Sequence, residues 1–197
     1  MIDYSILAKS VEFYETSGFQ RIESPWTVTA GISDITRPKD KKAFELIHDD
    51  HKVLVASGEQ SFLYLYAKGF LPLGVYQTIT PCFRSDSFDS THTKYFMKNE
   101  LIDAKTVTTE RLDEIVQIAF NFFKKYCPEK DLRIQGDGIT GLQYDIEYKG
   151  VELGSYGIRS CPFVEWIYAT GVAEPRLSST LKRFELALRE DERFKNC

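Results

Sequence analysis

Three segments of the chain repeat their apolar positions with the period of an α-helix. The first covers residues 3–17 and is followed by Gly18, a residue type that often ends a helix. Thr108 can cap the second helix, Pro128 ends it, and Pro175 opens the third. The apolar stripes are Ile6, Leu7, Val11 and Tyr14; Leu112, Ile115, Val116, Ala119, Phe122 and Phe123; and Leu177, Leu181, Phe184 and Leu188.

Short runs of β-branched and aromatic residues between these helices predict strands. A short helix is predicted at residues 62–66 with Gly69 as its end, and residues 31–42 are predicted to form a loop. The predicted strands are residues 19–26, 52–56, 75–80, 95–102, 132–135, 142–148 and 164–168. The pattern therefore predicts an α+β fold, a mainly antiparallel sheet flanked by helices.

Composition and charge narrow the class of protein. The 197 residues are 43% hydrophobic, lack a long apolar run, and show neither a linker nor an import signal. We therefore expect a single domain over residues 1–197, no membrane partner and a cytoplasmic location. A net charge of -4 excludes a general attraction to phosphate backbones, and Lys39, Lys41 and Lys42, which flank Asp40, are interpreted as an exposed loop.

The richest chemistry lies in one predicted hairpin. It carries Arg84, Asp86, His92 and Phe96 within thirteen residues. An arginine can bind a phosphate through two hydrogen bonds, an acid can accept from an exocyclic amine, a histidine can contact a distal phosphate, and a ring can stack on a purine. This set of residues indicates a nucleoside triphosphate site.

A second polar group consists of Asp145, Glu152 and Ser155, with Gly150 and Gly154 between them. Two carboxylates and a hydroxyl suit Mg²⁺, which completes its octahedron with phosphates and water. The alternative interpretation is a solvent-facing hairpin with scattered charges.

A third feature is Arg176 in the first turn of the last predicted helix. The helix dipole disfavours a cation at that end, so an anion between the arginine and the helix start would explain its presence. The alternative is an arginine that simply turns outward.

Taken together, these groups resemble the three signature motifs of class II aminoacyl-tRNA synthetases. Residues 18–25 look like motif 1, which forms the dimer contact in that family, and residues 80–86 with 92–96 and Glu100 resemble motif 2 of the seryl type. Residues 171–176 resemble motif 3. By contrast, residues 145–159 are similar to aspartyl- and asparaginyl-type enzymes and to the ammonia-dependent asparagine synthetase.

The resemblance implies a role for each site residue. Arg84 would hold the α-phosphate of ATP and Phe96 would stack on adenine. Asp86, where the family usually has Glu, would lie near the adenine amine. His92 and Arg176 would hold the γ-phosphate.

The same resemblance implies a metal site and an amino-acid site. Glu152 and Ser155 would bind Mg²⁺ with Asp145. Glu59 lies where related enzymes recognise the α-amino group, and Arg159 would face a substrate carboxylate.

The expected function is ATP-dependent formation of an aminoacyl adenylate by a homodimer. The acceptor of the acyl group is open: tRNA, another carrier, ammonia or an amine. Because nothing in the sequence is left for an anticodon-binding domain, we expect a catalytic domain alone. Two alternatives remain, a non-catalytic paralogue that binds ligands or a partner in a regulatory role, and a structural dimerisation module.

Overall fold

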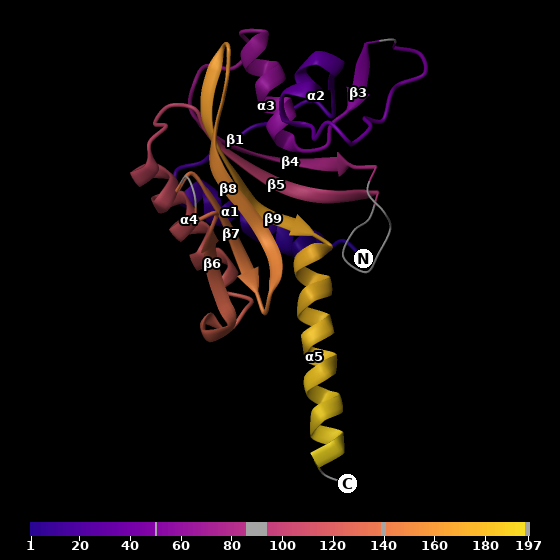
Figure 1. Ribbon diagram of the computed structural model, residues 1–197, viewed down its shortest axis with the longest axis vertical. Coiled ribbons are helices and arrows are strands. Elements are labelled where there is room, and N and C mark those ends of the chain that lie inside the picture. The colour runs from indigo at the N-terminus through magenta and orange to yellow at the C-terminus, as the bar shows by residue number, and fades with distance from the viewer. Residues whose placement is uncertain (50, 86–93, 139–140, 196–197) are drawn as a thin grey trace.

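A seven-stranded sheet forms the centre of the computed structural model, which describes residues 1–49, 51–85, 94–138 and 141–195 (Figure 1). The strand order is β1-β4-β5-β9-β8-β7-β6, and every neighbouring pair is antiparallel except the parallel pair β1 and β4. The strands are β1 (Gln20–Arg21), β4 (Val75–Phe83), β5 (Tyr95–Asp103), β6 (Leu132–Gly136), β7 (Gln143–Tyr148), β8 (Val151–Cys161) and β9 (Val164–Glu174). The α+β prediction is confirmed.

Helices lie on both faces of this sheet. The helices α1 (Tyr4–Thr16) and α4 (Thr109–Phe123) pack in one core with one face, and a short 3₁₀ helix (Glu129–Asp131) follows α4. The opposite face carries α3 (Gly58–Ala67) in a second core. No helix in the described part of the chain is both long and apolar enough to cross a membrane.

The remaining elements flank α3 and the end of β9. A two-stranded antiparallel sheet of β2 (Thr27–Thr29) and β3 (Lys52–Leu54) lies beside α2 (Ala30–Thr36) and α3. The last helix, α5 (Arg176–Lys195), follows β9 and projects away from the sheet (Figure 1).

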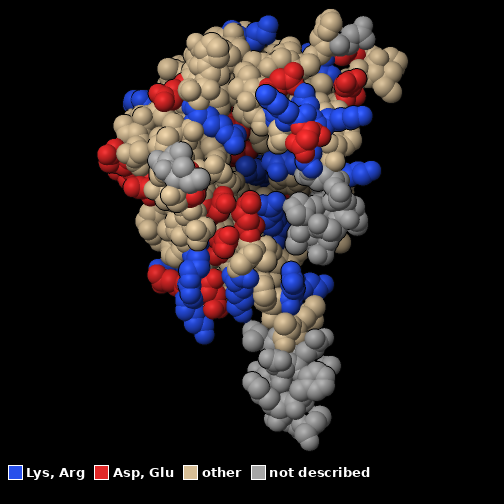
Figure 2. All heavy atoms as spheres, in the orientation of Figure 1, with Lys and Arg blue, Asp and Glu red and all other residues tan. Residues whose placement is uncertain are grey.

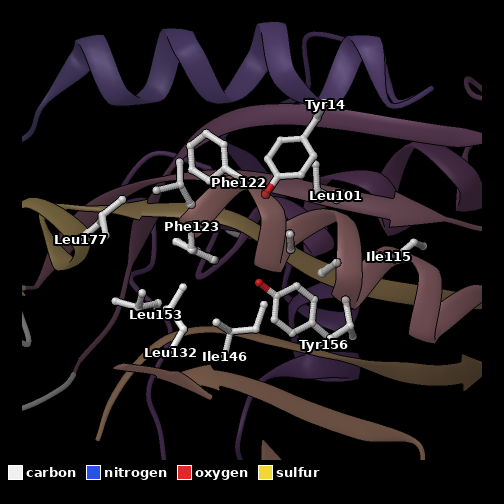
Figure 3. Close-up of a cluster of buried hydrophobic side chains, with 14 of the residues drawn as sticks. Tyr14, Leu101, Ile115, Phe122, Phe123, Leu132, Ile146, Leu153, Tyr156 and Leu177 are labelled. Carbon is white, nitrogen blue, oxygen red and sulfur yellow. The ribbon is translucent and has the colours of Figure 1, made fainter. Parts of the chain in front are cut away.

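Buried tyrosines tie the larger core to the backbone of β9 (Figure 3). The hydroxyl of Tyr14 on α1 donates to the carbonyl of Gly171 at 2.9 Å, and the hydroxyl of Tyr156 on β8 donates to that of Thr170 at 2.9 Å. Since both hydroxyls are fully buried, these bonds remove the cost of desolvating them. They fix α1 and β8 relative to the end of β9, where the candidate site begins.

Three local predictions were wrong. Residues 31–42 were predicted as a loop, but residues up to Thr36 belong to α2, whose carbonyl at Ser33 accepts from the side chain of Gln60 on α3 at 3.1 Å. Of the strand predicted at 19–26 only Gln20–Arg21 pairs with the large sheet. The chain enters the small sheet beyond Pro25, which is consistent with a proline ending a ladder.

The third error concerns β8, which the sequence pattern missed, and β9, which extends six residues beyond the predicted end at residue 168. Glycine is unfavourable in strands, so Gly154 and Gly157 weaken the strand pattern in the sequence of β8. A Cβ atom at Gly154 would meet the Cβ of Thr170 at 2.9 Å, and one at Gly157 would meet the Tyr168 ring at 2.8 Å. Glycine is required there because side chains of the neighbouring strand lie across it.

We predict that Gly58→Ala destabilises the fold by about 1–3 kcal/mol because the new methyl group overpacks the start of α3. It would meet the Cβ of Glu100 at 2.9 Å and the hydroxyl of Thr80 at 3.0 Å. The matched control is Gly31→Ala in α2, which has open space around it and should be neutral or stabilising by about 0.5–1 kcal/mol. Urea unfolding of the two variants measures the difference, and equal stabilities would contradict the packing of α3 on β4 and β5.

Candidate active site

A cavity of about 380 Å³ lies between the sheet, the start of α3 and residues 36–43. On this face of the molecule, basic and acidic side chains gather around a hollow next to the small sheet (Figure 2). Seven of the ten residues predicted from the sequence line the cavity: Glu59, Arg84, Phe96, Glu152, Ser155, Arg159 and Arg176. Asp145 pairs with Ser155 across β7 and β8 but does not line the cavity, and Asp86 and His92 are outside the described residues.

Arg84 and Phe96 come from the two sides of one hairpin. Cys82 pairs with Phe96 across β4 and β5, and the amide of Arg84 donates to the carbonyl of Lys94 at 3.0 Å. The Nε of Arg84 donates to the carbonyl of Ala56 at 3.1 Å, and the guanidinium carbon lies 5.0 Å from the centre of the Phe96 ring. The hairpin and the chain before α3 together hold this cation at the cavity wall.

Arg176 faces the cavity and does not turn outward. Its Nη1 donates to the Oε1 of Glu152 on β8 at 2.7 Å, and the arginine side chain is 20% exposed. Glu152 thus supplies part of the negative charge that was predicted beside the start of this helix. Because the Glu152 side chain is 48% exposed, the pair is worth at most about 1 kcal/mol and can open for a ligand.

The three residues proposed for Mg²⁺ lie close together at the β7–β8 pair. Asp145 is directly opposite Ser155 in the ladder and hydrogen bonded to it, and burial raises the pKa of Asp145, with the charge of Glu152 adding to the shift. The Oδ1 of Asp145 is buried without a hydrogen-bond partner among the described residues. A cation would satisfy this oxygen, so the donor set fits Mg²⁺.

Within the described ranges, no group of three or more His, Cys, Asp or Glu side chains is arranged to hold a metal ion. Phosphate and water oxygens would therefore have to complete the coordination, as is usual for Mg²⁺.

Glu59 and Arg159, which are one hundred positions apart, form an ion pair in which the carboxylate is buried and the arginine side chain is 40% exposed. The Nη1 of Arg159 donates to both carboxylate oxygens of Glu59, at 3.0 and 2.8 Å, and the indole Nε1 of Trp166 donates to Oε1 at 2.8 Å. The guanidinium carbon also lies 4.0 Å from the centre of the Tyr168 ring. Burial raises the pKa of Glu59, and the positive charge of Arg159 is the main opposing influence.

The sequence missed several basic residues of the cavity. Arg37, Lys41 and Lys42 line it. Residues 39–42 do form a loop, as predicted, with Lys39, Asp40 and Lys42 exposed. The amide of Lys42 donates to the hydroxyl of Ser85 at 3.2 Å, which connects this segment to the base of the hairpin. The local sequence carries no signal for that contact.

Lys98 is another cavity residue that was not predicted, although the alternation of residues along the strand could have indicated it. Alternate residues of a strand share a face, so Lys98 lies on the same face of β5 as Phe96 and Glu100. It lines the cavity, and its Nζ donates to the Oε1 of the buried Glu100 at 2.7 Å.

No family model and no curated protein matches the sequence. Solved structures do match the fold. The cytoplasmic serine-tRNA ligase of Naegleria fowleri in complex with AMP shares 16% identity with a TM-score of 0.68, over 90% of this chain and 52% of the ligase. The seryl-tRNA synthetase of Pyrococcus horikoshii complexed with ATP shares 16% identity with a TM-score of 0.67, over 91% of this chain and 49% of the synthetase.

The pyrrolysyl-tRNA synthetase of Desulfitobacterium hafniense gives 17% identity and a TM-score of 0.69, over 95% of this chain and 69% of the synthetase. The chain thus spans about half the length of the two seryl enzymes. At these identities the likeness establishes the fold, and the fold is that of the class II aminoacyl-tRNA synthetase catalytic core.

The raised pKa of Glu59 predicts how the ion pair affects stability with pH. A carboxyl whose pKa in the folded state exceeds its ordinary value of 4.5 binds a proton more tightly when folded, so its contribution is greatest below that value and is lost as pH rises through the folded pKa. The melting temperature of the wild type minus that of Glu59→Gln should therefore fall as the pH rises above 4.5.

Calorimetry of both proteins across this range measures the trend. Glu165→Gln, which changes an exposed acid of β9, should show no such trend. If the difference in melting temperature instead grows with pH, the positive charge of Arg159 lowers the pKa of Glu59 by more than burial raises it.

Proposed function

We propose that this protein activates a carboxylic acid of the amino-acid class with ATP, forming an acyl adenylate and pyrophosphate. One observation carries the proposal: residues chosen from distant parts of the sequence for this chemistry line a single cavity. The complexes of the seryl enzymes with AMP and ATP add support, since those proteins share the fold.

The reaction needs no nucleophilic side chain. A carboxylate oxygen of the substrate attacks the α-phosphorus, the bond between that phosphorus and the bridging oxygen breaks, and the electron pair leaves with pyrophosphate. Arg84 would offset negative charge on the α-phosphoryl oxygens. Holding the carboxylate in line with the phosphorus can supply on the order of 7–11 kcal/mol.

The other residues would place the nucleotide. Phe96 would stack on adenine through the ring face that Arg84 leaves uncovered, with Asp86 near the adenine amine. Arg176 and His92 would bind the γ-phosphate, and Arg176 would leave Glu152 to do so. Glu152 and Ser155, with Asp145, would hold Mg²⁺, whose charge would neutralise the phosphates.

The proposal extends to the setting of the reaction. Residues 1–197 would act as one catalytic domain of a cytoplasmic homodimer, with tRNA, a carrier or a small amine as acceptor. The homodimer and the choice of acceptors rest on the resemblance of the three motifs to the synthetase family, and the single domain and the location rest on the composition of the sequence.

Pyrophosphate exchange tests the activity directly. We expect ATP and Mg²⁺ with a panel of amino acids and related acids to transfer labelled pyrophosphate into ATP, and chelation of Mg²⁺ to stop the exchange. Stabilisation by ATP, which amounts to about 2.7 kcal/mol at one hundred times the dissociation constant, without exchange of any acid would favour the non-catalytic paralogue. Absence of both would refute the proposal.

We predict that Arg84→Ala weakens ATP binding at least about tenfold, because a hydrogen bond to a charged group is worth about 1.5–3 kcal/mol. Phe96→Ala removes a stacking surface worth about 0.5–1.5 kcal/mol and should weaken binding severalfold. Both side chains line an open cavity, so both variants should remain folded. Titration calorimetry with ATP provides the measurement, and Arg21→Ala on the exposed edge strand β1 is the matched control. Unchanged ATP affinity in both variants would remove these residues from the site.

A further inference from the structure

A buried carboxylate lies at the end of β9, two residues before Arg176. Glu174 is fully buried, and it does not line the cavity. Its Oε2 accepts hydrogen bonds from the backbone amide of Asp3 at 3.2 Å and from the hydroxyl of Ser178 at 2.6 Å. Its Oε1 accepts from the backbone amide of Ser178 at 3.1 Å. These donors offset the cost of burying the carboxylate, and they commit both of its oxygens within the protein.

Glu174 fixes the first turn of α5. Ser178 is the third residue of this helix, and the first four amides of a helix have no partner within it. The carboxylate of Glu174 binds the Ser178 amide as a capping side chain does, and its negative charge suits the positive end of the helix dipole. Leu177 in the same turn is buried in the larger core. Arg176 therefore projects from a turn that both the core and Glu174 hold in place.

Glu174 also joins this turn to α1. The amide of Asp3 donates to Glu174, while the side chain of Asp3 caps α1. Three residues earlier in β9, the carbonyl of Gly171 accepts from the hydroxyl of Tyr14 on α1. One carboxylate thus connects the starts of two helices to the end of the strand that precedes Arg176.

The bond between Arg176 and Glu152 does not by itself hold the arginine in the cavity. The Glu152 side chain is half exposed, and an ion pair of this kind is weak. In the proposed reaction the same pair opens, because Arg176 binds a phosphate and Glu152 a metal ion. The backbone of the first turn of α5 then sets the direction of Arg176, and Glu174 binds that backbone.

We infer that Glu174 is a positioning residue: it holds the first turn of α5 so that the guanidinium of Arg176 faces the cavity and binds the terminal phosphate of ATP. Glu174 itself does not contact the nucleotide. The inference rests on the proposed function for the ligand of Arg176. The mobility of Arg176, which can be measured without a ligand, tests the positioning separately.

The test compares the affinities for ATP and ADP, because their ratio reports the contacts to the γ-phosphate. Titration calorimetry with Mg²⁺ should show a wild-type preference for ATP that Arg176→Ala lowers at least about tenfold. Glu174→Ala removes the acceptor of three hydrogen bonds, and should lower the preference at least about threefold while the affinity for ADP stays within about twofold. An unchanged preference for ATP in either variant would overturn the inference.

A double substitution shows whether Glu174 acts through Arg176. Two residues that act as one unit give effects that do not add. In the Arg176→Ala background, Glu174→Ala should therefore lower the preference for ATP by no more than about twofold further. Full additivity of the two effects would mean that Glu174 influences the site by another mechanism, and the inference would be wrong.

Thr108→Ala is the matched control for a loss of stability. The Thr108 hydroxyl caps α4 by accepting from the amide of Arg111, so this variant also loses a helix cap, but on the face of the sheet opposite the cavity. It should lower the melting temperature and leave the preference for ATP unchanged. If Thr108→Ala lowers the preference as much as Glu174→Ala does, a general loss of stability explains the effect and the inference is wrong.

A milder variant covers the case in which Glu174→Ala does not fold. Ser178→Ala removes only the 2.6 Å bond to Glu174 and keeps the amide contact. It should lower the preference for ATP in the wild-type background and not in the Arg176→Ala background. No change in the wild-type background would overturn the inference.

The mobility of Arg176 provides a measurement without nucleotide. Relaxation of the ¹⁵N nucleus in its Nε–H group should show a lower order parameter in Glu174→Ala than in the wild type, and no change in Thr108→Ala. If the wild-type protein neither binds ATP nor exchanges pyrophosphate, the proposed function fails, and the order parameter alone decides whether Glu174 positions Arg176. Equal order parameters in the wild type and Glu174→Ala would then overturn the inference.

Discussion

The hydrogen-bond register of the strands β4, β5, β9 and β8 is the constraint on which the site depends. Met97 pairs with Glu174, so the beginning of β5 lies beside the end of β9. That register places Phe96 near the start of α5 and its Arg176. Arg159 pairs with Trp166 across β8 and β9 in the same sheet, so both can reach Glu59. A shift of one residue would turn these side chains to the opposite face and disperse the site.

The second determinant is the distribution of charge. The chain carries a net charge of -4, yet the cavity lining is strongly basic. Buried or half-buried carboxylates compensate part of that charge from within, as Glu100 does for Lys98 and Glu59 for Arg159. Such pairs keep the cations in place without a ligand. Burying the carboxylates costs desolvation free energy, which is also the main cause of the raised pKa of Glu59. A polyanionic ligand would find these donors already oriented.

Elements with a strong local signal were predictable from the sequence. The helix α1 has an apolar stripe and an Asp3 cap, and α4 has a stripe and a Thr108 cap; both follow from spacing alone. The hairpin of β4 and β5 was likewise predictable from β-branched and aromatic runs. The helix α2 and strand β8 were not, because tertiary contacts decide them: a glutamine from α3 binds α2, and side chains of β9 cover the glycines of β8.

The same division applies to the site. Residues whose types suit binding of phosphate, a metal ion or a nucleotide base could be selected from the sequence. The sheet register brings seven of these residues to one cavity. The pairing of Glu59 with Arg159 depends on how α3 packs over β8 and β9, which no local pattern encodes. That packing buries Glu59 and brings its carboxylate onto the guanidinium of Arg159.

Photoaffinity labelling tests most directly whether the cavity binds the nucleotide. An ATP analogue with a photoreactive azide on the adenine ring would be bound, irradiated and mapped by mass spectrometry of proteolytic fragments. We expect label on the fragment that contains Phe96 or on the cavity segment of residues 36–43, with protection by excess ATP. Protected label on α4, across the sheet from the cavity, would contradict it.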